Sequence, residues 1–156
     1  MKRIAGLAAA AVAALALGAC ERVDPGPNFV VSDETFDQSF FFCHVEPEVL
    51  FARKCGPGDQ GVGDRSGGCH FNSSAVSGMA LIDHPAVRCD ANDKPDPTQI
   101  GAGSPAQSNF QSASLEMSRD YLTAPIYVRP TGANHPRAIF DKSDPAVTVI
   151  STWAQK

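Results

Sequence analysis

The sequence predicts a mainly α, loop-rich single domain behind a short N-terminal leader. Apolar residues make up 43% of the chain and charged residues 19%, which is typical of a globular protein. Apolar residues recur every three to four positions after polar capping residues, whereas no stretch alternates convincingly as a strand would. The 13 Gly and 12 Pro among 156 residues predict long connections between few regular elements. What remains after the leader is long enough for one core.

The leader has the pattern of a secretory signal. A positive segment, MKR, precedes the apolar run Ile4–Leu17, which is mostly Ala, Leu and Val. The LGAC sequence that ends at Cys20 resembles the lipobox of bacterial lipoproteins. This resemblance implies a signal peptide of residues 1–19 and a diacylglycerol group on Cys20, which would become the first residue. An ordinary signal peptide with a chance cysteine, or an Ala-rich helix, is the alternative.

Residues 20–34 contain two Pro, one Gly and several charges, and we expect a flexible tether between lipid and domain. Glu21 follows the cysteine, and by analogy with Gram-negative sorting this favours the outer membrane of the cell envelope. The domain is predicted to span residues 35–156. No second apolar run of about 18 residues follows the leader, so no spanning helix is expected there. The net charge of −4 and the absence of a Lys/Arg cluster argue against nucleic-acid binding.

The first helix of the domain is expected to begin at Thr35, with Gln38 completing a capping box. Pro47 lacks an N–H and clashes with the preceding turn, so a kink or a restart is predicted there. The predicted apolar face consists of Phe36, Phe40, Cys43, Val45, Val49, Leu50 and Phe51.

Two more helices are expected. Residues 114–122 form a short candidate with Leu115, Met117 and Leu122 as apolar positions. The last helix should follow Ser143 and Asp144, because a polar cap before Pro145 is typical of a helix start. Its apolar face would contain Val147, Ile150, Trp153 and Ala154. The stretches rich in Gly, Pro and Ser, which we expect to be connections, are 56–68, 90–109 and 129–138.

Four cysteines follow Cys20, namely Cys43, Cys55, Cys69 and Cys89. An exported chain lies in an oxidising compartment, so two disulfides are expected, with three pairings open. In the chain-entropy model, closing the loop from 55 to 69 would contribute about 3 kcal/mol and closing 43 to 89 about 4 kcal/mol.

Cys69 followed directly by His70, with Cys55 upstream, also suits covalent haem attachment. Two thiols add to the vinyl groups of the porphyrin, and the adjacent imidazole binds the iron.

Two segments resemble cytochrome c-like domains of haem-rich bacterial proteomes. The stretch FCHVEPEVLFARKC, residues 42–55, is similar to the helix that leads into the C-x-x-C-H motif of that family. The stretch YVRPTGANHP, residues 127–136, resembles its arginine–proline–His-Pro segment, and Phe140, Asp144-Pro145-Ala146 and Ile150–Trp153 resemble its closing helix. The resemblance covers residues 40–82 and 121–154.

The resemblance implies a cytochrome c-like fold with one haem c attached through Cys69 and Cys55. His70 would be the proximal ligand and His135 the distal one. Cys43 and Cys89 have no haem role in the family motif, so they are expected to pair as a disulfide. The motif is interrupted, because 13 residues separate Cys55 from Cys69 where the family has two. The glycines in this insertion ease the approach of its ends, and would equally permit a Cys55–Cys69 disulfide.

Other donors compete for the sixth position on the iron. Met79 and Met117 are rival ligands, since thioether sulfur is a common sixth ligand, although a methionine is more often plain core packing. His44 and His84 are expected to be structural or exposed. The scattered carboxylates, which we expect to be solvated, are Glu46, Glu48, Asp83, Asp90, Asp93 and Asp96.

Other chemistries have no starting motif. The chain has no C-x-x-C pair of a thioredoxin-like protein or zinc ribbon, no G-x-S-x-G elbow and no phosphate-binding loop. Cys69 and His70 are adjacent, so both cannot bind one zinc ion without strain. The sequence therefore predicts a lipid-anchored electron-transfer protein of the cell envelope, which meets the membrane through its lipid and a redox protein as partner, rather than an enzyme. The alternative is a haem-free, disulfide-stapled lipoprotein with a structural or interaction role.

Overall fold

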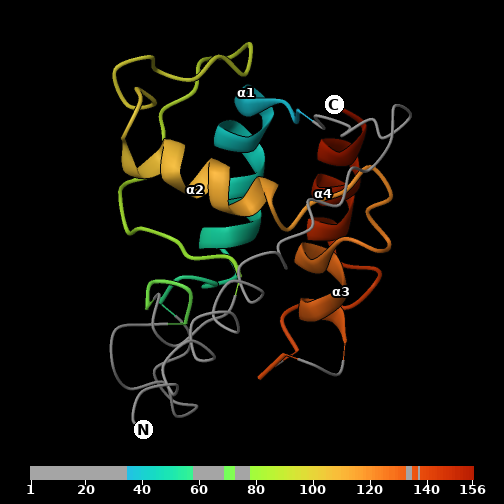
Figure 1. Ribbon diagram of the computed structural model, residues 1–156. Helices are drawn as coiled ribbons and strands as arrows, with labels where there is room; N and C mark the ends of the chain where they lie inside the picture. Colours follow the sequence, from blue (N-terminus) through green and yellow to red (C-terminus); the bar gives the residue numbers. More distant parts are fainter. Residues whose placement is uncertain (1–34, 58–68, 73–77, 133–134, 137) are drawn as a thin grey trace, which may run out of the picture. The chain divides into compact units, whose positions relative to one another are not determined.

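The computed structural model describes residues 35–57, 69–72, 78–132, 135–136 and 138–156. The predicted signal peptide 1–19, the lipidated Cys20 and the tether 20–34 lie outside the described residues. The described residues belong to one compact unit, Glu34–Lys156. They form helices and no strand, as expected for a mainly α domain (Figure 1).

The first helix begins at α1, Gln38–Phe40, and continues as the π-helix η1, Phe41–Phe51. Its N-cap is Asp37, whose side chain accepts a hydrogen bond from the backbone N–H of Phe40 at 2.9 Å. The prediction of Thr35 as N-cap is therefore wrong. Asp37 is an equally good capping residue, and starting the helix there leaves Phe36 free to enter the core, where it is 5% exposed.

The helix is not broken at Pro47, contrary to the predicted kink or restart. Residues 41–51 instead adopt the wider π-helical turn. The same bond pattern continues past residue 51, where Pro47 O accepts from the N–H of Ala52 and Leu50 O accepts from the N–H of Cys55. Each of these bonds spans five residues, whereas an α-helix spans four. The wider turn relieves the clash that a proline ring makes with the preceding turn of an α-helix.

Helix α2, Pro105–Ser114, lies where a connection was predicted, and the predicted helix 114–122 does not form. Ser104 caps α2 by accepting from the N–H of Gln107, and Pro105 occupies the first turn. This is the same start signal as the one recognised at the last helix. In 114–122 only Met117 is buried among the three apolar positions; Leu115 is 85% exposed, so no continuous apolar face drives a helix there.

Two further helices complete the described fold. Helix α3, Pro125–Thr131, was not predicted and takes in the start of the expected connection 129–138. Helix α4, Pro145–Gln155, confirms the predicted last helix, with Asp144 as N-cap accepting from the N–H of Ala146.

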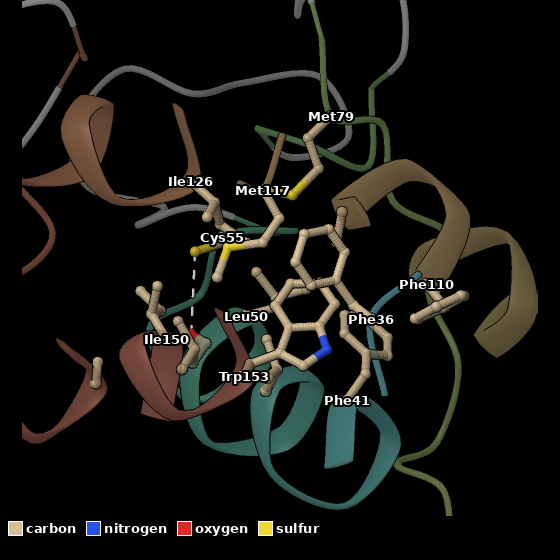
Figure 2. Close-up of a cluster of buried hydrophobic side chains, with 14 of the residues drawn as sticks. Phe36, Phe41, Leu50, Cys55, Met79, Phe110, Met117, Ile126, Ile150 and Trp153 are labelled. Carbon is tan, nitrogen blue, oxygen red and sulfur yellow. Dashed lines mark hydrogen bonds between the residues drawn. The ribbon is translucent and has the colours of Figure 1, made fainter. Parts of the chain in front are cut away.

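The core lies around η1, which packs against α4 and α2 (Figure 1). Phe41 of η1 contacts both Phe110 of α2, with ring centroids 5.4 Å apart, and Trp153 of α4 at 5.2 Å (Figure 2). The Trp153 ring N–H donates to Asp37 O at 3.1 Å, which fixes α4 against the start of α1. In the described part of the chain, no helix has the length and apolarity needed to cross a membrane.

Candidate functional site

The chain on either side of the insertion is joined by two backbone hydrogen bonds. His70 N–H donates to Cys55 O at 3.1 Å, and Phe71 N–H donates to Gly56 O at 3.2 Å. In an uninterrupted C-x-x-C-H helix, the histidine N–H would also bond to the first cysteine carbonyl, four residues earlier. The structure thus brings His70 against Cys55 in the backbone relation that the short motif would create, although 13 residues separate the two cysteines.

Gly56 allows this closure because a side chain would have no room there. A Cβ atom at Gly56 would lie 2.3 Å from the ring atoms of Phe71. The ring therefore covers the backbone of residue 56 and holds the start of the 69–72 segment against the end of η1.

His70 is held in a single orientation. Its Nδ1 donates to Met79 O at 2.5 Å, and its backbone carbonyl accepts from the N–H of Leu81 at 2.8 Å. A ring nitrogen that donates to a backbone carbonyl leaves the other nitrogen, Nε2, with its lone pair, which is the arrangement found in metal-bound histidines. Burial lowers the pKa of His70, so the neutral imidazole that binds metals is favoured near neutral pH.

His135 lies beside His70, although the two residues are 65 positions apart. Their ring centroids are 6.3 Å apart and their planes are 17° from parallel. Two imidazoles bound to opposite sides of one metal ion, with metal–nitrogen bonds of about 2 Å, have centroids roughly 6 Å apart. The separation of these two rings matches that value, and their nearly parallel planes are those of a stacked pair.

Both histidines line one cavity of about 40 Å³. Cys55 and Met79 belong to the same lining, and in Figure 2 Cys55 lies near Ile126 while Met79 lies beyond Met117. Cys55 is buried, and its Sγ lies 4.0 Å from Val49 O. Met117 is buried in the core but does not line the cavity, so of the two predicted methionine ligands only Met79 reaches it.

The cavity rim carries one ion pair. Arg129 Nη1 lies 3.4 Å from Glu116 Oε2, and both side chains line the cavity. Gly78, with φ +103°, passes under this pair, and a Cβ there would lie 2.5 Å from Glu116 Oε1. Nothing in the sequence pattern singled out this pair, because α3 was not expected.

Cys43 and Cys89 form a disulfide with an S–S distance of 1.97 Å, which confirms the predicted pairing. Cys55 and Cys69 are not disulfide-bonded in this structure, and Cys69 is half-buried. The disulfide thus ties η1 to the segment after Val87 and leaves the other two cysteines at the ends of the insertion.

The prediction that Glu46 is solvated is wrong. Its side chain is fully buried in η1, where it contacts Asn109 of α2 and His84. Glu48, by contrast, is exposed two positions later on the same helix. Spacing could not distinguish these two carboxylates, because the wide π-helical turn changes which residues face the core.

Among the described residues, no group of three or more His, Cys, Asp or Glu side chains is placed to bind a metal ion. No family model, curated protein or solved structure matches this chain.

Proposed function

We propose that this chain is a lipid-anchored electron-transfer protein of the cell envelope that carries one haem c. The observation that carries the proposal is the closure of the insertion, in which His70 N–H bonds to Cys55 O. It restores between these two residues the backbone contact of a C-x-x-C-H turn, which the sequence alone leaves open.

The residues at the cavity have the chemistry that a haem requires. Cys55 and Cys69 supply two thiols, His70 presents a neutral imidazole of fixed tautomer, and His135 lies within reach as a second ligand. The apolar side chains of the lining would cover the porphyrin faces, and the Arg129 guanidinium at the rim would pair with its propionates. When bound, such a group supplies reversible one-electron chemistry at its iron.

The size of the cavity sets one condition on this proposal. A volume of about 40 Å³ is far below the ~300 Å³ or more of pockets that enclose an organic ligand. The haem-loaded protein must therefore hold its lining segments further apart than they stand here. Pro130 of α3, His135 and Phe140 all line the cavity. The N–H of Ile139, next to Phe140, donates to Pro130 O and so joins this part of the lining to α3.

Expression of the full chain in a host with haem-maturation machinery tests the proposal. We expect a red protein whose haem stays attached after denaturation, with the thioether mass on peptides containing Cys55 and Cys69. Spectra should show an intense Soret band and no Met–iron charge-transfer band, because His135 rather than Met79 is the proposed sixth ligand.

Single variants assign the ligands. His70→Ala should abolish normal iron ligation, whereas His135→Ala should leave bound haem with an open sixth position that takes up carbon monoxide or cyanide. His44→Ala is the matched control, because His44 of η1 pairs with Glu48 of the same helix and with Asp93 and does not line the cavity. The spectrum of this variant should be unchanged.

Deletion of residues 57–67 tests the closure directly. It leaves the sequence C-G-G-C-H, the standard spacing, between ends that the structure already places together. The deletion variant should attach haem at least as completely as the full chain. A variant that folds yet attaches no haem would contradict the proposed role of Cys55.

A haem-free, disulfide-stapled lipoprotein with a structural or interaction role is the second candidate. The small cavity and the nearness of the two ends of the insertion favour it. Colourless protein from the same host, with Cys55 linked to Cys69 on non-reducing peptide maps, would establish this reading in place of the first.

The lipid anchor is part of both candidates and has its own test. Mass spectrometry of the mature N-terminus should find acylated Cys20, and the protein should partition into detergent. A free, unmodified terminus at another residue would remove the anchor from either candidate.

A further inference from the structure

Glu46 occupies an unusual position for a carboxylate. Its side chain is 0% exposed in the middle of η1, and its Oε1 lies 2.9 Å from Asn109 Nδ2 and 3.0 Å from His84 Nε2. Its second oxygen, Oε2, has no hydrogen-bond partner among the described residues. A buried carboxylate with one bare oxygen is costly unless its charge is neutralised.

The tautomer of His84 follows from its other contact. Nδ1 lies 2.7 Å from Pro85 O, and because a carbonyl oxygen only accepts, Nδ1 must carry a hydrogen. The ring is 10% exposed and packs edge-on against Phe51, with centroids 5.4 Å apart. His84 therefore presents only Nε2 to Glu46.

The contact between Nε2 and Oε1 then needs one hydrogen. A carboxylate oxygen and an imidazole lone pair both accept, so they can approach to 3.0 Å favourably only with a proton between them. The proton can sit on the carboxyl group, beside a neutral imidazole, or on the imidazole, beside a carboxylate. In both arrangements the pair has no net charge.

We propose that Glu46 and His84 share one proton in the folded core and that this proton is taken up on folding. The proposal does not depend on haem. Burial is the main reason that the pKa of Glu46 is raised, and it outweighs the opposing effects of Asn109 and His84.

The other polar groups around Glu46 and His84 do not displace the shared proton. Asn109, from α2, is neutral, and Asp83, beside His84 in the chain, is exposed. On η1 itself, His44 and Glu48 bond to each other at 2.8 Å, on a side of the helix that solvent reaches. Among the described residues, His84 is the titratable side chain that contacts Glu46.

The Glu46–His84 pair is also connected to the candidate site, through Asn109 and the segment around Ile82. Asn109 Oδ1 accepts from Ile82 N–H at 2.7 Å, and Asn109 Nδ2 donates to Ile82 O as well as to Glu46. The residues just before Ile82 provide the two contacts that hold His70, through Met79 O and the N–H of Leu81. Glu46 and His84 are thus positioning residues for the segment that orients His70.

The number of protons released on unfolding tests the proposal. At pH 8 an unfolded chain carries ionised glutamate and neutral histidine, so the shared proton must leave when the full chain is unfolded in urea. We expect wild-type protein to release about one proton more per molecule than Glu46→Gln. The glutamine side chain does not ionise, so this variant has no carboxyl proton to release. Asp83→Asn, which changes an exposed carboxylate of the same segment, should behave like wild type.

Equal proton release from wild type and Glu46→Gln would overturn the proposal. If Glu46→Gln does not fold, NMR of the wild-type full chain decides the question. At pH 8 the Glu46 carboxyl carbon should still have the chemical shift of a carboxyl group that holds or shares a proton, and His84 Nδ1 should carry a hydrogen. A fully ionised Glu46 in the folded protein at this pH would equally reject a shared proton.

Discussion

At the scale of single residues, the backbone around the candidate site depends on positions where only small or polar side chains fit. Gly78 is the clearest case, because its φ of +103° lies in the region that favours glycine and its Cα faces the Glu116–Arg129 pair. The next residue, Met79, supplies the carbonyl that fixes His70.

Gly78→Ala should therefore destabilise the protein by about 1–3 kcal/mol, because it adds backbone strain and also forces the Glu116 side chain to shift. Urea unfolding measures the loss. Gly101→Ala is the control, because a Cβ there meets nothing within 4 Å and its φ is not strained. Equal stabilities of the two variants would show that residue 78 does not constrain this segment.

Asp96 provides a residue-scale prediction about acid. Hydrogen bonds from Thr98, with a further one from Arg88, lower the pKa of Asp96 to about 2. A carboxyl group whose pKa falls on folding stabilises the protein above the unfolded value and loses that effect as the pH drops. The stabilisation should disappear between about pH 4 and pH 2.

Asp96→Asn removes this dependence. Its urea midpoint should fall less steeply than that of wild type over the same pH range. Asp83→Asn leaves the hydrogen bonds of Asp96 intact and should keep the wild-type slope. The lowered pKa values of Asp90 and Asp141 leave part of the slope in every variant. A wild-type slope in Asp96→Asn would contradict the assignment.

At the scale of elements, α1, α2 and α4 each begin at a side-chain cap, whereas α3 begins at Ala124 without one. Asp37, Ser104 and Asp144 each accept a backbone N–H at the first turn of a helix. Asp144 has a second contact, an ion pair with Arg53 that joins α4 to the turn after η1. The cap and the ion pair can be separated by choice of substitution.

Asp144→Ala should cost about 1–2 kcal/mol of stability, mostly through loss of the cap. Asp144→Asn should cost less, because asparagine caps as well as aspartate and only the partly exposed ion pair is lost, which contributes below about 1 kcal/mol. Thermal or urea unfolding of both variants checks the order. Equal losses in the two variants would mean that the ion pair, which both substitutions remove, rather than the cap anchors α4.

At the scale of the whole molecule, contacts between distant parts of the chain supplement the hydrophobic core. The Cys43–Cys89 disulfide joins η1 to a segment 46 residues away, and Trp153 binds the carbonyl of Asp37. These connections hold together a domain whose 78–104 stretch contains no helix.

The double variant Cys43→Ser/Cys89→Ser should lose about 4 kcal/mol of stability, the chain-entropy value for a loop of this length. Urea unfolding measures the loss, and chemical reduction of the wild type should reproduce it. A loss below about 1 kcal/mol would indicate that the unfolded chain is already compact in this region.

Local signals in the sequence determined the helix-rich class, the last helix and the cap at Asp144. Cap and proline patterns act over a few residues, so they can be recognised without a fold. The same signal at Ser104-Pro105 marks α2, but the loop composition of 90–109 obscured it. The sequence itself shows that Cys69 and His70 are adjacent, and a family resemblance suggested the Cys43–Cys89 disulfide.

Only the tertiary structure decided which residues meet. It closed the insertion by bonding His70 to Cys55, and it brought His135 within 6.3 Å of His70. It buried Glu46 and left Glu48 exposed, because the π-helical turn around Pro47 breaks the regular spacing on which face prediction depends. The first two outcomes depend on contacts between parts of the chain far apart in sequence. The third depends on a π-helical turn, whereas prediction of a helix face from spacing assumes an α-helix.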